Sequence, residues 1–233
     1  MSKGNKKSFA IIAIIVGAVG VGIGAYTIVN VSTNLDQQSS IAPADTSDQG
    51  LHSLMLNGSP VLGSMDAPIT IIEYGDYQCP NCQRFATQIK PLIVENYINT
   101  GQVKLVFKDF TIYGNDSVNG AIATYCAGEQ NKFWELHDYI YENQGAVNSG
   151  WLSINNIKKF ASEVGLGMQQ FNTCFDERKY NQQVTENFEQ GKSIGITGTP
   201  TFIIINSDGE AKAVPGAQPY TVFKQVLDEM LES

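Results

Sequence analysis

Two cysteines separated by two residues place a pair of sulfur atoms where they could do thiol chemistry. Cys79 and Cys82 enclose Pro80 and Asn81, and the surrounding segment Ile69–Phe85 reads ITIIEYGDYQCPNCQRF. The reactive form of a cysteine is the thiolate, which is scarce near neutrality because a free thiol has a pKa of about 8.5. Free N–H groups and the helix dipole stabilise a thiolate at a helix start. This spacing therefore predicts a pair that exchanges disulfides.

The order of the two sulfur atoms predicts their roles. Cys79 comes first, at the expected helix start, and is predicted to be the exposed nucleophile. Cys82 lies one helical turn further and can resolve a mixed disulfide by attacking Cys79. Pro80 suits the first helical turn, where a backbone N–H has no partner to lose and φ is already helical.

The motif is expected to sit between two buried strands. Ile69–Tyr74 is an apolar, β-branched run that predicts a strand buried on both faces, in which Glu73 is anomalous. Apolar residues at helical spacing then predict a helix, kinked at Pro91. Val103–Phe107 predicts a second strand and is followed by Lys108. Strand, helix and strand together form a βαβ unit.

The rest of the chain divides into a helical section and a short closing section. Apolar stripes at helical spacing predict helices from about 115 to 194, and His137 beside one stripe is expected to be structural. GITGTP at Gly195–Pro200 predicts a turn. The predicted closing elements are a strand at Thr201–Ile205, a hairpin turn at Ser207–Gly209, a strand at Ala211–Val214 and a helix at Tyr220–Leu231.

The N-terminal segment is predicted to anchor the chain in a membrane. Phe9–Val29 holds 21 residues without a charge, enough to cross a hydrocarbon core about 30 Å thick. Lys3, Lys6 and Lys7 precede it, so the positive-inside rule places the N-terminus in the cytoplasm. The rival interpretation is a cleaved signal peptide, but its apolar region is usually shorter.

Composition then sets the domain plan and the compartment. We expect a lysine-bearing anchor at 1–30, a polar linker at 31–58 and one globular domain at 59–233. Beyond residue 30 the chain carries 12 basic and 23 acidic residues, so no basic surface is left to bind nucleic acid. A globular domain outside the cytoplasm lies in an oxidising solvent, where disulfides persist.

The remaining cysteines, Cys126 and Cys174, leave three interpretations open. They could join a metal site, stay as two buried thiols, or form a second disulfide. Zinc sites usually pair two closely spaced motifs, and only one such motif is present here. An even number of cysteines in an oxidising compartment favours the disulfide. In the chain-entropy model that bond stabilises by about 4 kcal/mol, which suits a structural role.

Four separated segments give the chain a family resemblance: EYGDYQCPNC, YCAGEQNKFWELHDYIYENQ, CFDERKY and GITGTPTF. Together they resemble the DsbA-like branch of the thioredoxin superfamily over about Ser59 to the C-terminus. The resemblance implies an α/β thioredoxin fold with an inserted helical domain and no cofactor other than the redox-active disulfide. It also supports Cys79 as nucleophile, Cys82 as resolving thiol and a Cys126–Cys174 disulfide.

The same resemblance implies roles for residues outside the motif. Pro200 matches the cis-proline that faces the motif in the family, and it would leave a backbone edge at Thr199 for an extended substrate. Glu73 lies where the superfamily often has a buried acid, and Lys108 resembles the partner of that acid. Such a carboxylate could take a proton from Cys82, or it could form a structural ion pair only.

One departure from the family leaves the direction of electron flow open. Strongly oxidising relatives commonly have histidine where this chain has Asn81, so the thiolate lacks a nearby cation. The leading hypothesis is an extracytoplasmic oxidase of exported protein thiols, recharged by a membrane quinone-linked oxidase that the family implies. The alternatives are a reductase or isomerase, and a CxxC metal-binding or chaperone module.

Overall fold

A four-stranded sheet with the strand order β2-β1-β3-β4 forms the centre of residues 53–233, the part of the chain that the computed structural model describes. The predicted anchor at 1–30 and most of the predicted linker lie outside the described residues. Within residues 53–233 no helix has the length and apolar character needed to cross a membrane. The strands are β1 (Ile69–Gly75), β2 (Val103–Asp109), β3 (Thr201–Ile205) and β4 (Ala211–Pro215).

Strand β1 lies inside the sheet and carries the motif at its C-terminal end. It pairs parallel with β2 and antiparallel with β3, and all seven of its residues are buried. Such two-sided burial explains its continuous apolar run. Glu73 pairs in register with Phe107 on one side and with Phe202 on the other. Side chains alternate along a strand, so Glu73 lies on the same face as Ile69.

The segment that follows the motif is helical but not uniformly α-helical. It consists of α2 (Pro80–Arg84), the π-helical segment η1 (Phe85–Ile89), α3 (Lys90–Ile93) and the π-helical segment η2 (Val94–Ile98). The Lys90 N–H donates to the carbonyl of Phe85, five residues back. Pro91 has no N–H and its ring collides with the preceding turn, so a wider turn accommodates it. The sequence predicted a kink at Pro91, and the structure has a widened, π-helical turn just before this residue.

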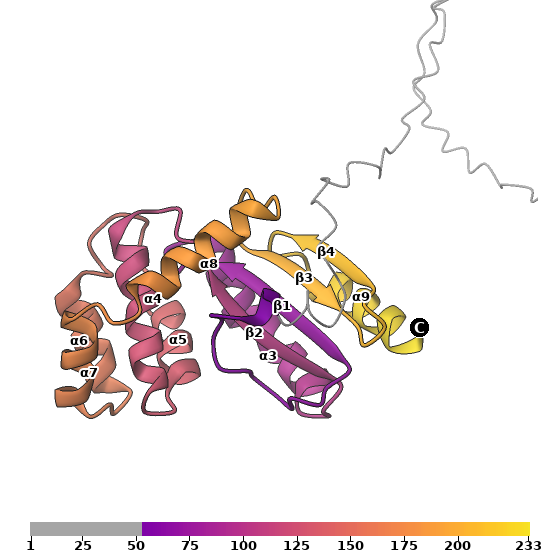
Figure 1. Ribbon diagram of the computed structural model, residues 1–233, viewed down its shortest axis with the longest axis horizontal. Coiled ribbons are helices and arrows are strands. Elements are labelled where there is room, and N and C mark those ends of the chain that lie inside the picture. The colour runs from indigo at the N-terminus through magenta and orange to yellow at the C-terminus, as the bar shows by residue number, and fades with distance from the viewer. Residues whose placement is uncertain (1–52) are drawn as a thin grey trace, which may run out of the picture. The chain divides into compact units, whose positions relative to one another are not determined.

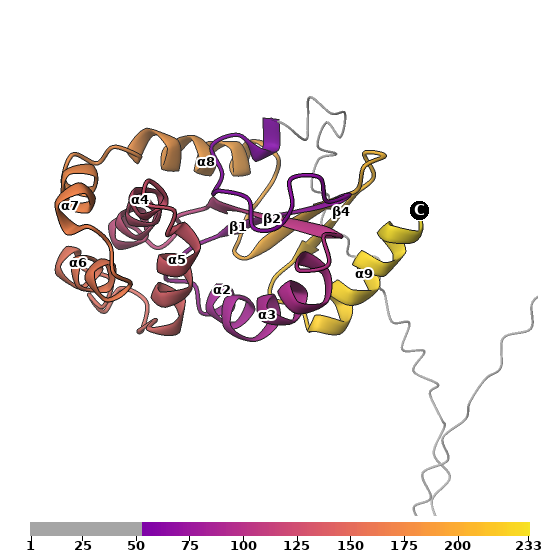
Figure 2. The same cartoon turned by 90° about the horizontal axis from the view of Figure 1, so that it is seen from below.

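Helices cover both faces of the sheet. Figure 2 shows α8 (Asn181–Ser193) on one side of the strands, and α2, α3 and α9 (Tyr220–Glu232) on the other. One apolar core lies under α9 and the helices that follow the motif, and it includes Phe85, Phe202 and Phe223. A second core lies on the opposite face and includes Tyr74. The motif helix is therefore held between the sheet and its neighbours.

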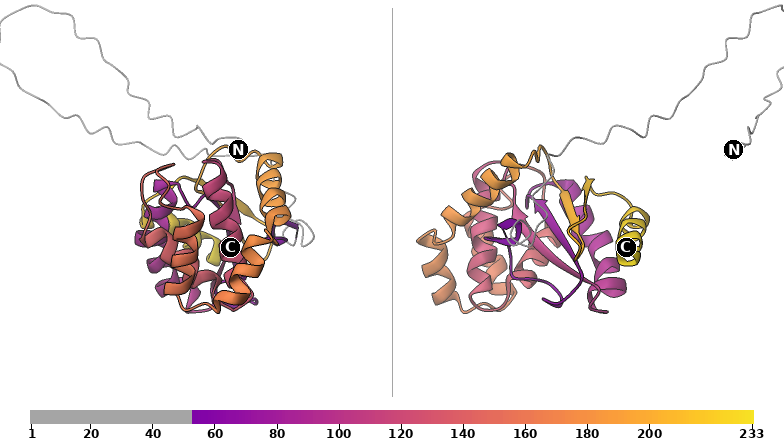
Figure 3. Two further views of the ribbon diagram at one scale, coloured as in Figure 1. Left: turned by 90° about the vertical axis from the view of Figure 1, so that its left-hand side faces the viewer. Right: turned by 45° about the vertical axis from the view of Figure 1, so that its right-hand side comes forward.

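The remaining helices form an insertion between β2 and β3, as the sequence predicted. They are α4 (Asn115–Gly128), α5 (Phe133–Glu142), α6 (Ile154–Glu163) and α7 (Met168–Asp176), followed by α8. Figures 1 and 3 show α4 to α7 grouped at one end of the sheet. Cys79 and Cys82 belong to the apolar core of this insertion. The packing of α4 against Leu152 depends on Gly120, where an added Cβ atom would lie 2.9 Å from the Leu152 side chain.

Candidate active site

The turn between β1 and α2 places Cys79 at the start of a helix. Cys79 is the N-cap residue of α2, with an extended backbone, and Pro80 occupies the first helical turn. The N–H of Cys79 donates to the carbonyl of Asp76 at 2.9 Å. The free N–H groups of the first turn therefore face the sulfur atom, as the sequence predicted. Pro80 and Asn81 are both exposed at this helix end.

Asp76 organises this turn, and sequence reasoning did not identify it. One carboxylate oxygen accepts from the Gln78 N–H at 2.8 Å and the Ser117 hydroxyl at 2.6 Å. The other accepts from the N–H groups of Ile112 at 2.7 Å and Tyr113 at 3.1 Å. Burial raises the pKa of Asp76, and these four hydrogen bonds oppose the rise. An acid within the turn that leads to a helix start was the available signal.

The electrostatics of the turn favour a thiolate at Cys79. Its pKa is lowered from 9.0 to about 6, first by a hydrogen bond with the Cys82 thiol, then by Thr199 and by backbone N–H groups, against the opposing effect of burial. As a thiol, Cys79 donates to the Thr199 carbonyl at 3.3 Å. The Thr199 hydroxyl has no other hydrogen-bond partner within residues 53–233. It is therefore free to donate to the sulfur atom after the proton has left.

Cys82 has the opposite properties. It is fully buried, and burial raises its pKa well above the ordinary value, with the hydrogen bond to Cys79 as the second cause. The two thiols are not bonded to one another. The prediction that Cys79 is exposed was wrong, because the residue is only 2% exposed. Thr199 contacts the Cys79 sulfur atom and belongs to a loop that is distant in sequence. The sequence around the motif therefore could not show that this loop shields Cys79 from solvent.

The loop before β3 faces the motif, as the family resemblance implied. The peptide bond between Thr199 and Pro200 is cis. The Pro200 carbonyl accepts from the Gly216 N–H at 2.7 Å, which ties this loop to the residue that follows β4. Cys79, Cys82, Thr199 and Pro200 thus come together in one place.

Glu73 is buried, and its charge interacts with both cysteines. It is 1% exposed, and within the described residues neither of its carboxylate oxygens has a hydrogen-bond partner. Burial raises the pKa of Glu73 to about 8, while Lys90 acts to lower it and Asp138 and Cys79 to raise it further. Lys90 forms an ion pair with Asp138. Neither Lys90 nor Asp138 was identified from the sequence.

The predicted pairing of Glu73 with Lys108 is wrong. Lys108 pairs in register with Tyr74, so its side chain lies on the face of the sheet opposite to Glu73. Its amine donates to the carbonyls of Leu54 and Leu56 and to the side chain of Gln190 on α8. Burial lowers the pKa of Lys108 to about 8. Lys108 therefore stabilises the packing of α8 on the sheet.

The other two cysteines form a disulfide within the insertion. Cys126 of α4 and Cys174 of α7 are bonded, with their Cα atoms 5.8 Å apart. The bond joins two helices that are 48 residues apart in sequence, which agrees with the structural role that the sequence favoured. The interpretation as two free buried thiols is therefore excluded.

His137 has a structural position, as expected. Its ring is fully buried among aromatic side chains, and Nδ1 lies 3.0 Å from the Tyr77 hydroxyl. Burial lowers the pKa of His137 well below 6.5, so the ring is neutral. Residues 53–233 hold no group of three or more His, Cys, Asp or Glu side chains placed to bind a metal ion.

The loop after α5 fixes the motif from the insertion side, and this contact was not predicted. The Gln144 side chain donates to the carbonyls of Tyr77 at 2.7 Å and Cys79 at 3.2 Å. The Gln78 side chain accepts from the Asn148 N–H at 2.8 Å and donates to the Ser117 hydroxyl at 3.0 Å. Both glutamines link segments about 65 to 70 residues apart, for which one sequence carries no signal.

This arrangement defines a class of enzyme. A thioredoxin fold with a helical insertion holds a low-pKa thiol, a buried second thiol and a cis-proline loop, and this is the site of a protein thiol:disulfide oxidoreductase. The family model described as Thioredoxin matches residues 56–228, so the chain belongs to this family.

Comparisons with curated proteins and solved structures agree with this class. Disulfide bond formation protein D of Bacillus subtilis is 28% identical over 180 residues, which cover 76% of this chain and 79% of the relative. The probable disulfide bond formation protein D of Bacillus cereus is 27% identical over 207 residues, 87% of this chain and 89% of the relative. The oxidised crystal structure of BdbD from Bacillus subtilis has a TM-score of 0.68 at 26% identity, over 75% of this chain and 94% of the other.

A further solved structure supports the fold alone. The alpha-DsbA1 structure from Wolbachia pipientis has a TM-score of 0.68 at 24% identity, over 76% of this chain and 92% of the other. The DsbA-like architecture with its helical insertion, which the sequence predicted, is confirmed.

Proposed function

We propose that the chain is a membrane-anchored, extracytoplasmic enzyme that introduces or exchanges disulfide bonds in exported proteins through Cys79 and Cys82. The observation that carries this proposal is the difference between the two thiols. The pKa of Cys79 is lowered to about 6, whereas that of Cys82 is raised well above 9.0. At neutral pH only Cys79 is a thiolate, so nucleophile and resolving thiol have separate roles.

The disulfide form oxidises a substrate in two exchanges. A substrate thiolate attacks the Cys79 sulfur atom, the enzyme disulfide breaks, and Cys82 leaves as a thiolate that takes up a proton. A second substrate thiolate then attacks the substrate sulfur atom of the mixed disulfide, and Cys79 leaves as a thiolate. Two electrons pass from the substrate dithiol to the enzyme. The low pKa of Cys79 makes it a good leaving group, which favours this direction.

The Thr199 backbone and a cavity beside the motif provide a site for an extended polypeptide. In the dithiol form, the Thr199 carbonyl accepts from the Cys79 thiol. In the mixed disulfide Cys79 has no proton, so this carbonyl is free to accept from a substrate N–H. A cavity of about 440 Å³ lies beside the motif, lined by Asn81, Arg84, Gln88 and the segment 216–220. Backbone pairing of this kind gives broad specificity.

Glu73 is the proposed proton carrier for Cys82. Its pKa of about 8 lets it give a proton to the Cys82 thiolate during substrate oxidation. It takes the proton back when a partner recharges the enzyme, because Cys82 must then lose its proton to attack the mixed disulfide. The recharging partner that we propose is a membrane quinone-linked oxidase, which would meet an enzyme anchored through Phe9–Val29 in the same bilayer.

The reduction potential of the Cys79/Cys82 couple tests the direction of the reaction. It is measured by equilibration with glutathione redox buffers, beside the rate at which the oxidised enzyme introduces disulfides into a reduced, unfolded protein. A potential closer to about −120 mV than to about −270 mV supports an oxidase, and the reverse result supports a reductase. Supplied with a disulfide-bonded protein, Cys82→Ser should accumulate a mixed disulfide, because its Cys79 thiolate attacks the disulfide and no resolving thiol remains, and Cys79→Ser should not.

The location is tested in cells that produce the full chain. We expect the protein in the membrane fraction, with its C-terminal domain digested by protease added to intact spheroplasts. Mass spectrometry should find the intact N-terminal segment. A mature N-terminus beyond Asn30, or a domain protected until the spheroplasts are lysed, would contradict the anchored arrangement.

A further inference from the structure

A proton on Glu73 needs a route to solvent. The residue is 1% exposed and lies between Phe107 and Phe202 in the sheet. Within residues 53–233 its two oxygens contact no hydrogen-bond donor. Each catalytic cycle that moves a proton between Glu73 and Cys82 changes the charge of this buried carboxyl group. Such a change is costly unless a nearby charge compensates it and a path to water exists.

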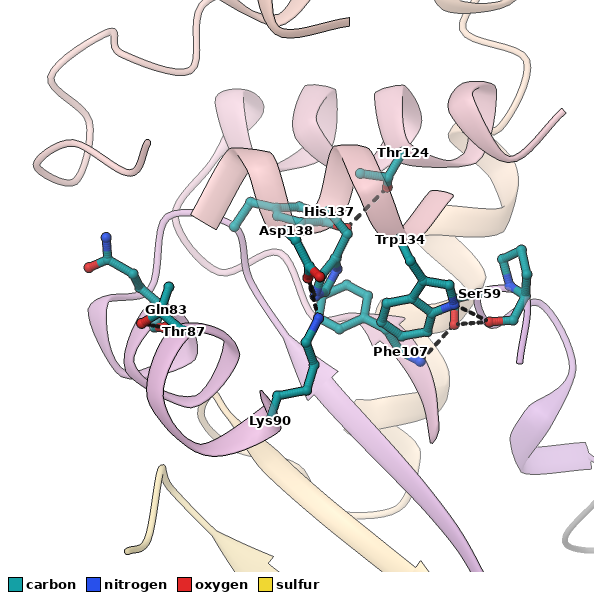
Figure 4. Close-up of polar contacts among 11 residues, drawn as sticks. Ser59, Gln83, Thr87, Lys90, Phe107, Thr124, Trp134, His137 and Asp138 are labelled. Carbon is teal, nitrogen blue, oxygen red and sulfur yellow. Dashed lines mark hydrogen bonds and ion pairs between the residues drawn. The ribbon is translucent and has the colours of Figure 1, made fainter. Parts of the chain in front are cut away.

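Lys90 provides a positive charge between α3 and α5. Its side chain is 5% exposed and forms an ion pair with Asp138 of α5, and its amine lies 5.2 Å from the centre of the Trp134 ring. Figure 4 shows the Lys90 side chain reaching toward Asp138. Asp138 Oδ1 also lies 3.8 Å from Nε2 of His137, and the centre of the His137 ring lies 4.8 Å from that of Phe107, the strand neighbour of Glu73. The ion pair is therefore linked to the surroundings of Glu73 through the His137 and Phe107 rings.

The other end of the ion pair reaches solvent. The Asp138 side chain is 43% exposed. Lys90 and Asp138 both line a cavity of about 460 Å³ between α3 and α5, together with Glu95 and Glu142. The inner partner is thus buried, and the outer partner is accessible to water.

The groups that act on Glu73 come from every element packed around it. Lys90 favours the carboxylate, and Asp138 and Cys79 oppose it. His137 is neutral because burial lowers its pKa. The charged and titratable groups whose ionisation couples to that of Glu73 are Cys79 and Cys82 of the motif, Tyr77 of the turn, Lys90 of α3, and Asp138 and Tyr141 of α5. Of these, Lys90 is the one cation, and Asp138 partly neutralises it.

We propose that Lys90 and Asp138 are positioning residues for the proton transfer between Cys82 and Glu73, and that their ion pair connects Glu73 with the cavity between α3 and α5. During recharging, Cys82 gives its proton to the Glu73 carboxylate, and the Cys82 thiolate attacks Cys79. The disulfide forms and the thiolate of the partner leaves. Glu73 then releases its proton to the cavity. The inference rests on the proposed role of Glu73.

The direct test is a titration of Glu73 by NMR of carboxyl-labelled protein, in the full-length enzyme and its variants. Lys90→Met removes the cation and leaves the Asp138 charge, so the apparent pKa of Glu73 should rise by about one unit. Asp138→Asn leaves the Lys90 charge without its counter-ion, so the apparent pKa of Glu73 should fall by a similar amount. The double variant should titrate near the wild type. Lys159→Met, which breaks an exposed ion pair with Glu163, is the matched control.

The rate of the resolving step should follow these shifts. At pH 7 we expect about a tenfold slower step in Lys90→Met and a faster step in Asp138→Asn, because the carboxylate fraction of Glu73 changes in these directions. A purely structural pair would not move the two variants in opposite directions. If Lys90→Met does not fold, Asp138→Asn carries the test, because its side chain is partly exposed.

Two failures can be told apart. Should both variants titrate like Lys159→Met, or shift the same way, the positioning role is overturned while the role of Glu73 stands. An unchanged resolving rate in Glu73→Gln would instead remove the proposed role of Glu73, and the inference with it.

Discussion

At the scale of single residues, Cys79 is activated by groups of its own turn and by Thr199, and among the described residues no side-chain cation contributes to lowering its pKa. Its pKa is lowered to about 6 by hydrogen bonds from Cys82, Thr199 and backbone N–H groups. Asn81, which is exposed beside the motif, adds no charge. The absence of histidine at this position therefore does not prevent a stabilised thiolate, although it leaves room for further stabilisation.

Asn81→His should strengthen that stabilisation. An imidazolium beside the sulfur atom favours the thiolate, so the pKa of Cys79 should fall by about one unit and the couple should become more oxidising by about 30 mV. Thiolate absorbance at 240 nm and equilibration with glutathione measure the two quantities. Gln88→His, exposed further along the helical segment, is the control. An equal effect of both variants would show that long-range charge, not contact, is responsible.

Glu73 is predicted to make folding stability depend on pH. Its pKa is 4.5 in an unfolded chain and about 8 in the fold, so between these values the folded state holds a proton that the unfolded state loses. Stability therefore falls as pH rises from about 4.5 to 8, and the full cost is present above 8. Glu73→Gln should be more stable than the wild type at pH 9, by about 2 to 5 kcal/mol, and similar at pH 4.

Guanidinium unfolding of the oxidised protein at pH 4, 7 and 9 measures this difference, because oxidised cysteines do not titrate. The exposed Glu95→Gln is the control and should follow the wild type at each pH. A stability gain for Glu73→Gln that does not change with pH would argue against a raised pKa of the buried acid.

At the scale of elements, the β1–α2 turn depends on one carboxylate. Asp76→Ala would leave the buried N–H group of Gln78 and the partly buried N–H groups of Ile112 and Tyr113 without their acceptor. We expect a loss of about 3 kcal/mol in the free energy of unfolding, because unpaired buried donors cost 1 to 3 kcal/mol each. Chemical denaturation measures it. Asp66→Ala, at an exposed position, should leave the free energy of unfolding nearly unchanged. An equally small change in Asp76→Ala would mean that the turn does not depend on this carboxylate.

The elements themselves could largely be read from the sequence, because each carries a local pattern. The β-branched runs gave β1, β2 and β3, and the helical stripes gave the insertion. Register between strands is not local. Glu73 and Lys108 were expected to pair, but Glu73 aligns with Phe107, and this offset of one residue puts Lys108 on the other face. The same reason hid Lys90 and Asp138, whose contact joins α3 to α5.

At the scale of the whole molecule, the insertion completes the site that the sheet begins. Gln144 and Asn148 belong to the loop after α5 and bind the motif turn, and Asp138 of α5 lies beside the group that acts on Glu73. A scaffold that holds the motif from both sides keeps the turn fixed while the sulfur atoms change state. Sequence could place the insertion but not this contact, which arises only in the assembled fold.

The reduction potential as a function of pH reports on the whole molecule. Reduction takes up two electrons and two protons when both thiols are protonated, and one proton when Cys79 stays a thiolate. With a Cys79 pKa of about 6, the potential should fall by about 59 mV per pH unit below pH 6 and by about 30 mV above it. Equilibration with a thiol buffer from pH 4.5 to 8 locates the break, and Asn81→His should move it to lower pH. A constant slope of 59 mV up to pH 8 would show that Cys79 is an ordinary thiol, and the separation of roles between the two cysteines would then have no electrostatic basis.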